Sequence, residues 1–266
     1  MDRALTGPAA RYPWRLFGLL LGAGAISLAG VVPLLLEFVR PLLDRLPAPP
    51  LPLPVIVLLN MAQNIVLLAL ATGFGLVLAR KVGRGAPLLE GWLAGDSVGA
   101  RLRGLLKLSI PFGAFVGAVC LGALLLASLR LPDLPLTMEA RVPVWKRLAA
   151  CFYGGIVEEI LTRLLLLSLA AWLLGKIWRG ADGLPAAPAF WTANVLIAVL
   201  FGLGHLPVAS MMMTITPPVV ALAVVVNGFA SIVFGLLYWR RGLEAAMLAH
   251  FTADIVLHVA GPVLAR

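Results

Sequence analysis

Residues 154–163 read Gly-Gly-Ile-Val-Glu-Glu-Ile-Leu-Thr-Arg and lie inside an apolar run that extends from about residue 144 to residue 174. Two adjacent carboxylates and an arginine are costly there, because a charged side chain at membrane depth costs about 2.5–3.5 kcal/mol. In a helix, Glu159 and Arg163 stand four residues apart on one face and can pair. Glu158 points about 100° away from Glu159 and lacks that partner. The stretch therefore predicts a membrane helix in which Glu159 is structural and Glu158 is available for chemistry.

The composition places this helix in an integral membrane protein. The chain has 266 residues, of which 61% are hydrophobic and 12% are charged, whereas soluble domains carry about 25% charged residues. The predicted fold class is all-α, a polytopic membrane helix bundle. At about 20 apolar residues per crossing, the length allows about seven transmembrane helices, and one domain is the natural count.

Proline-rich and basic loops separate the apolar runs and set the expected boundaries. A short helix in the membrane interface is expected at residues 88–103, where Trp92 lies between charged residues. We divide the single membrane domain into spans of unassigned role, residues 1–143, and a core that carries the chemistry, residues 144–263. The expected spans are residues 14–39, 55–79, 105–129, 144–174, 190–215, 219–239 and 243–263.

The formal net charge of +9 indicates the partners and the orientation. The basic residues lie in the gaps between apolar runs and form no patch interleaved with aromatic residues, which argues against nucleic acid. Anionic lipid headgroups are the expected counter-charge. The loops on the same side as the amino terminus hold most of the lysines and arginines. The positive-inside rule therefore places the amino terminus in the cytoplasm.

Few other ionisable residues fall inside the predicted spans. The chain has three histidines, of which we interpret His258 as a core residue. His205 closes the sequence Phe-Gly-Leu-Gly-His, and His250 stands four residues before Asp254 on one helix face. Ionisable residues inside membrane proteins almost always face the bundle interior or a water-filled cavity. We therefore expect three helices to direct Glu158, His205 and His250 into one polar cavity.

These side chains suit hydrolysis. A glutamate can take a proton from water while a histidine orients that water or protonates the leaving amine. A second histidine can stabilise an oxyanion, with Asp254 selecting the tautomer of His250. The same types of residue also bind zinc, in which case Glu158, His205 and His250 would be the ligands. The residues alone leave the cofactor open between a divalent metal and none.

Three short motifs occur in order on separate predicted helices: Glu-Glu-x-x-x-Arg at residues 158–163, Phe-x-x-x-His at 201–205 and His-x-x-x-Asp at 250–254. Together they resemble the CPBP family of intramembrane proteases, which includes the CAAX prenyl endopeptidase and the bacterial Abi proteins. The resemblance covers about residues 147–258.

The resemblance implies an endopeptidase of a bacterial plasma membrane that acts on membrane-associated peptides or proteins, with or without a lipid group. It also implies roles: Glu158 is the base that activates water, His205 is its partner, and His250 with Asp254 stabilises the oxyanion. Glu159 and Arg163 support the site. Many members have Asn where this chain has Asp254.

A different class of function stays open at this point. Buried acids and imidazoles also suit a proton- or ion-coupled carrier, in which Glu158, His205, His250 and Asp254 form a relay. No internal repeat typical of carriers is evident in the sequence. A catalytically inactive family member that binds lipid or a partner protein is a third alternative.

Overall fold

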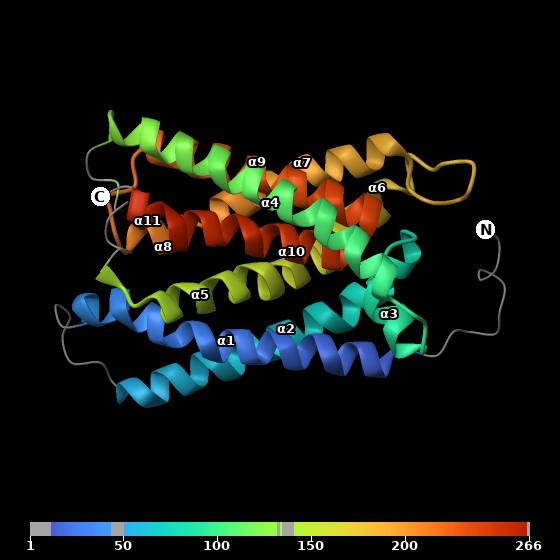
Figure 1. Ribbon diagram of the computed structural model, residues 1–266, viewed down its shortest axis with the longest axis horizontal. Coiled ribbons are helices and arrows are strands. Elements are labelled where there is room, and N and C mark those ends of the chain that lie inside the picture. Colours follow the sequence, from blue (N-terminus) through green and yellow to red (C-terminus); the bar gives the residue numbers. More distant parts are fainter. Residues whose placement is uncertain (1–11, 44–50, 132–133, 135–140, 265–266) are drawn as a thin grey trace.

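The computed structural model describes residues 12–43, 51–131, 134 and 141–264. Within these ranges the chain is a bundle of helices that run side by side, and the all-α fold class is confirmed (Figure 1). Six of these helices are long and apolar enough to cross a membrane. The bundle is built from α1 (Trp14–Leu43), α2 (Leu53–Lys81), α3 (Pro87–Leu93), α4 (Gly99–Ser128), α7 (Ala187–Gly204), α8 (Leu206–Ser210), α9 (Pro217–Arg241), α10 (Leu243–Asp254) and α11 (Gly261–Leu264), together with the segments described next.

The expected fourth span, residues 144–174, differs from the other spans because it is not one continuous α-helix. It consists of α5 (Val144–Phe152), two π-helical segments, η2 (Tyr153–Glu158) and η3 (Ile160–Leu167), and α6 (Ser168–Leu174). The run still passes from one end of the bundle to the other (Figure 1). A third π-helical segment, η4 (Ile255–Ala260), follows Asp254.

One expected boundary is wrong, and one span is divided. The interfacial helix predicted at residues 88–103 is only α3, and Gly99 already belongs to the long helix α4. Gly95, with a φ of 88°, lies between the two helices, in a conformation that favours glycine. The fifth span, Ala187–Ser210, is divided at His205 into α7 and α8, as expected for a helix that contains Pro207, which lies in the first turn of α8, where proline is tolerated.

Glycines let the helices approach each other closely, as is common in membranes. A Cβ atom on Gly113 would lie 2.2 Å from the carbonyl oxygen of Ala249, and one on Gly117 would lie 2.7 Å from that of Ala253. These two glycines, four residues apart, seat α4 directly against α10. On the other side of the bundle, a Cβ on Gly75 of α2 would lie 3.0 Å from the carbonyl carbon of Leu164 in η3.

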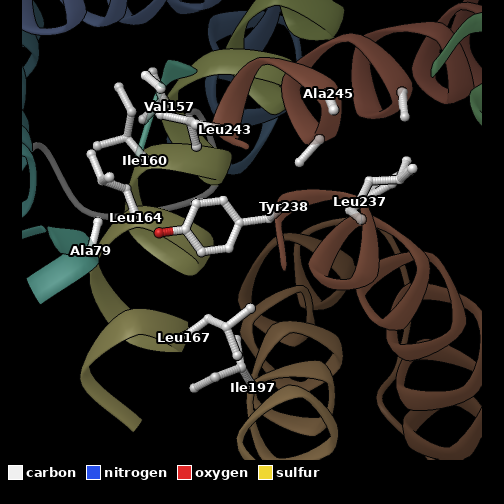
Figure 2. Close-up of a cluster of buried hydrophobic side chains, with 14 of the residues drawn as sticks. Ala79, Val157, Ile160, Leu164, Leu167, Ile197, Leu237, Tyr238, Leu243 and Ala245 are labelled. Carbon is white, nitrogen blue, oxygen red and sulfur yellow. The ribbon is translucent and has the colours of Figure 1, made fainter. Parts of the chain in front are cut away.

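The core around Tyr238 fixes α9 against the fourth span. The Tyr238 side chain is fully buried, and its ring extends from α9 into a group of apolar side chains (Figure 2). Its hydroxyl shares a 2.7 Å hydrogen bond with the hydroxyl of Ser168 in α6. A buried tyrosine normally needs such a partner for its hydroxyl, so this contact sets the register between the two helices.

The start of α10 is held by the segment before and within α3. The backbone N–H of Leu89 donates to Glu244 at 2.9 Å, and that of Leu243 donates to the carbonyl of Gly85 at 3.0 Å. Gly242 has a φ of 97°, and a Cβ there would lie 2.3 Å from Pro87. The turn into α10 is therefore fixed two helical turns before His250.

Candidate active site

Glu159 and Arg163 form the ion pair that their spacing predicts. Arg163 Nη1 lies 2.9 Å from Glu159 Oε1, and both side chains are enclosed, with 1% and 0% of their surfaces exposed. The same carboxylate oxygen accepts a hydrogen bond of 2.7 Å from Nδ1 of His250. A buried carboxylate with two such donors is a fixed part of the fold, and it ties the fourth span to α10.

Arg163 also connects the site to α9. Its Nη2 atom donates to the carbonyl and the hydroxyl of Ser231 at 3.1 and 3.0 Å, and its Nη1 atom donates to Thr162. The guanidinium lies 5.2 Å from the ring centre of Phe201 and 5.5 Å from that of Phe234. Both aromatic rings can stabilise the cation through their π faces.

The ring of His250 is held by its neighbours on several sides. It stacks on Phe234 with 4.6 Å between the ring centres and an angle of 22° between the planes. Because an ionised carboxylate can only accept, the contact with Glu159 places a proton on Nδ1. The opposite nitrogen, Nε2, lies 3.8 Å from Glu158 Oε2 and 3.6 Å from Asp254 Oδ1.

One sequence prediction about His250 is wrong. We expected Asp254 to select its tautomer, but Nδ1 bonds Glu159, and Asp254 lies on the Nε2 side. The spacing of four residues placed the two side chains near each other correctly. It could not show that a carboxylate from another helix reaches Nδ1 of the ring.

The two adjacent glutamates have different environments. The side chain of Glu158 is 23% exposed, whereas that of Glu159 is fully enclosed. The backbone carbonyl of Glu158 accepts a hydrogen bond from Thr162. Glu158 is thus the more accessible carboxylate of the pair.

Gly154 leaves room for the side chains of Asp254 and His250. A Cβ at this position would lie 2.2 Å from Asp254 Oδ2 and 3.2 Å from His250 Nε2. Any larger residue would push Asp254 and His250 away from the fourth span. Our sequence reasoning gave Gly154 no role, although it begins the Gly-Gly-Ile-Val-Glu-Glu stretch.

His205 lies beside the cluster and, within the described part of the chain, makes no hydrogen bond or ion pair with Glu158 or His250. Its ring packs edge-on against Phe201 at 4.7 Å, and Phe201 in turn lies 6.0 Å from the ring of His250. Nδ1 of His205 lies 2.8 Å from the carbonyl oxygen of Phe201. Because a carbonyl only accepts, Nδ1 carries the proton and Nε2 is the basic nitrogen.

The π-helical segments coincide with the acidic residues of the site. Glu158 ends η2, Glu159 stands between η2 and η3, and Asp254 immediately precedes η4. Single-turn π segments inside α-helices occur frequently at functional sites, because the wider turn changes the direction of the side chains. No pattern in the sequence predicted these segments.

A zinc site made of Glu158, His205 and His250 does not fit this arrangement. Within the described residues, no three His, Cys, Asp or Glu side chains are grouped so that they could hold a metal ion. The bond of His250 Nδ1 to Glu159 leaves Nε2 as its one possible ligand atom, and within the described residues His205 has no hydrogen bond or ion pair with Glu158 or His250. We therefore derive no chemical step through a metal.

Sequence reasoning also missed Ser231 and Phe234 on α9. Ser231 is buried, and Phe234 packs against both His250 and Arg163. Their spacing of three residues places them on one face of α9. That signal is too common in apolar helices to have identified them.

Comparison with known proteins gives one match. Residues 140–256 match the family model described as "Type II CAAX prenyl endopeptidase Rce1-like". No curated protein and no solved structure matches the chain. The matched range contains Glu158, Glu159, Arg163, His205, His250 and Asp254. The resemblance noted in the sequence is therefore confirmed: residues 140–256 are similar to the Rce1-like type II CAAX prenyl endopeptidases.

Proposed function

We propose that the chain is an intramembrane endopeptidase that uses a water molecule activated by Glu158 to hydrolyse peptide bonds of membrane-associated substrates. The observation that carries this proposal is the contrast between two adjacent glutamates. Glu159 is enclosed and paired with Arg163, whereas Glu158 is partly exposed and lies 3.8 Å from Nε2 of His250. Similarity to a protease family favours hydrolysis over the carrier alternative.

In this proposal Glu158 is the general base. Its carboxylate takes one proton from water, and the remaining hydroxide adds to the carbonyl carbon of the scissile peptide. When the C–N bond breaks, the proton on Glu158 passes to the nitrogen of the leaving amine. One carboxylate can serve both steps, because it gains a proton in the first and loses it in the second.

His250 stabilises the oxyanion of the tetrahedral intermediate. Its Nδ1–H is fixed on Glu159, and its stacking on Phe234 holds the ring plane, so Nε2 faces the side on which Glu158 and Asp254 lie. When the ring carries its second proton, Nε2–H donates to the developing negative charge. A preorganised donor of this kind contributes about 10²–10³-fold to the rate.

His205 orients the attacking water. The bond from its Nδ1 to the carbonyl of Phe201 leaves Nε2 as an acceptor for one hydrogen of that water. The ring of Phe201 contacts both imidazoles, with ring centres 4.7 Å from His205 and 6.0 Å from His250. Asp254 contributes negative charge beside Nε2 of His250.

The substrate class proposed is a peptide or protein at the membrane. The matched family name specifies a CAAX prenyl endopeptidase, so a prenylated carboxyl-terminal peptide is the first substrate to test, beside unlipidated membrane peptides.

The test is cleavage by the purified full chain in lipid nanodiscs, followed by mass spectrometry of the products. It compares the wild type with Glu158→Gln, and includes Asp96→Asn as a control that removes an exposed carboxylate outside the site.

We expect kcat of Glu158→Gln to fall by about 10²–10⁴-fold, since a general base contributes that much. Asp96→Asn should cleave like the wild type, and cleavage should persist with a chelator. Retention of most activity in Glu158→Gln would overturn the assignment of the base. Absence of cleavage by the wild type, together with proton flux in sealed vesicles that Glu158→Gln abolishes, would indicate the carrier instead.

A further inference from the structure

A second polar feature lies at the end of the bundle where α2 and α6 end. It is a cavity of about 310 Å³, lined by Lys81, Trp172, Gly175, Lys176, Arg179, Gly183 and Pro185. The connection after α6 lies at the same end of the bundle as α3 (Figure 1). Trp172 lies fourteen residues beyond Glu158 on the fourth span, about 21 Å at 1.5 Å per residue. The cavity is therefore distinct from the candidate active site.

The charges around this cavity are all of one sign. Lys81, Lys176 and Arg179 line it, and no aspartate or glutamate does. Among the described residues, none of these three cations forms a salt bridge. Asp182 lies in the same connection, but its Oδ1 atom accepts a hydrogen bond of 3.0 Å from the backbone of Leu184.

Trp172 holds two of the cations in place. Nζ of Lys81 lies 4.7 Å from the centre of the indole ring, and Nζ of Lys176 lies 4.1 Å from it. Two ammonium groups that share one ring repel each other. An anion bound in the cavity offsets this repulsion.

The loop that carries Arg179 is fixed by its own backbone. Gly180 N–H donates to the carbonyl of Leu184 at 2.8 Å, and Ala186 N–H donates to that of Trp178 at 2.9 Å. Gly183 has a φ of 79°, which favours glycine in the turn. Arg179 is thus held on a closed turn beside the cavity.

From these observations we propose that the cavity binds a phosphate-type anion, supplied by a phospholipid headgroup or by free phosphate. Arginine and lysine are the side chains that bind phosphate, the first through its fork of N–H groups and the second as a point charge. The place also suits a headgroup, because an aromatic residue flanked by cations at the end of apolar helices is typical of the membrane interface. The cavity lies at the end of the bundle where α2 and α6 end. The positive-inside rule predicts that this end is on the cytoplasmic side.

The experiment measures binding to the full chain in detergent, with three probes: phosphatidylglycerol, the neutral lipid phosphatidylcholine, and inorganic phosphate. Native mass spectrometry counts retained lipid, and the thermal unfolding midpoint reports stabilisation by each probe. The cavity variant is Lys81→Gln/Lys176→Gln/Arg179→Gln. The matched control, Arg103→Gln/Lys107→Gln/Arg241→Gln, removes the same charge from exposed positions outside the cavity.

A lipid headgroup site predicts that the wild type and the control retain phosphatidylglycerol at least tenfold more tightly than phosphatidylcholine, and that the cavity variant loses this preference. A site for free phosphate predicts instead that inorganic phosphate raises the unfolding midpoint of the wild type and the control but not of the cavity variant. Arg179→Gln alone should show a smaller loss of the same kind. Equal behaviour of the cavity variant and the control toward all three probes would overturn the proposal.

Discussion

The helices before residue 131 and those after residue 141 are buried to different degrees. The buried share of the most apolar window is 28%, 6% and 28% for α1, α2 and α4, whereas it is 33%, 33% and 39% for the spans at residues 187–210, 217–241 and 243–263. Every side chain of the candidate active site comes from the second region. The comparison indicates that apolar helices of membrane length can serve different purposes, because the second region buries more of its residues and encloses the polar groups of the candidate site.

Helix α4 qualifies this division. It belongs to the first region, yet Gly113 meets the backbone of Ala249, the residue directly before His250. The sequence alone suggested a boundary at residue 143, with the chemistry entirely beyond it. Helix α4 packs against α10 and so supports the site from outside. Helix α2 contacts the fourth span where Gly75 meets Leu164.

The largest effect is expected from Arg163→Ala in the second region. Removal of the guanidinium leaves Glu159 buried without its cation, and breaking a buried pair in this way costs about 3–5 kcal/mol. Unfolding in mixed micelles should show this loss of stability, and cleavage should be abolished. Arg103→Ala, which removes an exposed arginine on α4, should leave both quantities close to those of the wild type.

A second substitution identifies the cause of that loss. Adding Glu159→Gln to Arg163→Ala removes the stranded charge, so part of the lost stability should return. If the double variant is no more stable than Arg163→Ala alone, the ion pair is not the reason for the effect. Glu159 and Arg163 are in contact, so their effects on stability are coupled. The stability of the double variant therefore cannot be obtained by adding the effects of the two single substitutions.

A smaller effect is expected from Gly113→Ala in the first region. The new Cβ would lie 2.2 Å from the carbonyl oxygen of Ala249, so α4 or α10 must shift. Overpacking of this kind costs about 1–3 kcal/mol, and displacement of a reacting group by about 1 Å can cost 10²-fold in rate. We expect kcat to fall by about tenfold or more while the protein stays folded.

Gly122→Ala is the matched control for this prediction. Gly122 lies on the same helix, and a Cβ there would meet no atom within 4 Å. Alanine is the better helix former by about 1 kcal/mol, so this variant should be as stable as the wild type or more stable. Equal activity of the two variants would show that the contact between α4 and α10 does not position His250.

The sequence predicted the features that depend on neighbours along the chain. The all-α class follows from apolar runs of membrane length, and the pair of Glu159 with Arg163 follows from the helical repeat. The contact of Glu159 with His250 could not be predicted in this way, because it joins residues 91 positions apart. The π-helical segments beside Glu158 and Asp254 were also missed, since they depend on how the helices pack.

The smallest effect is expected from replacing the amides on the outer face of α2. Asn60 and Gln63 are exposed, and Asn64 donates hydrogen bonds to the carbonyl and the side chain of Asn60 at 2.8 and 3.0 Å within the same helix. The triple variant Asn60→Leu/Gln63→Leu/Asn64→Leu removes no contact with the described site. Stability should change by no more than about 0.5 kcal/mol, and kcat/KM should stay within about twofold of the wild type.

Gly75→Ala provides the contrast on the inner face of α2. A Cβ there would lie 2.9–3.1 Å from the side chain and backbone of Leu164, the residue after Arg163, so this single methyl group should reduce cleavage more than the three leucines do. Measuring both variants with the same substrate compares the two faces of one helix. If the leucine variant loses more than about tenfold in kcat/KM while Gly75→Ala does not, α2 acts through its outer face, and the division between a lipid-facing region and a catalytic region fails.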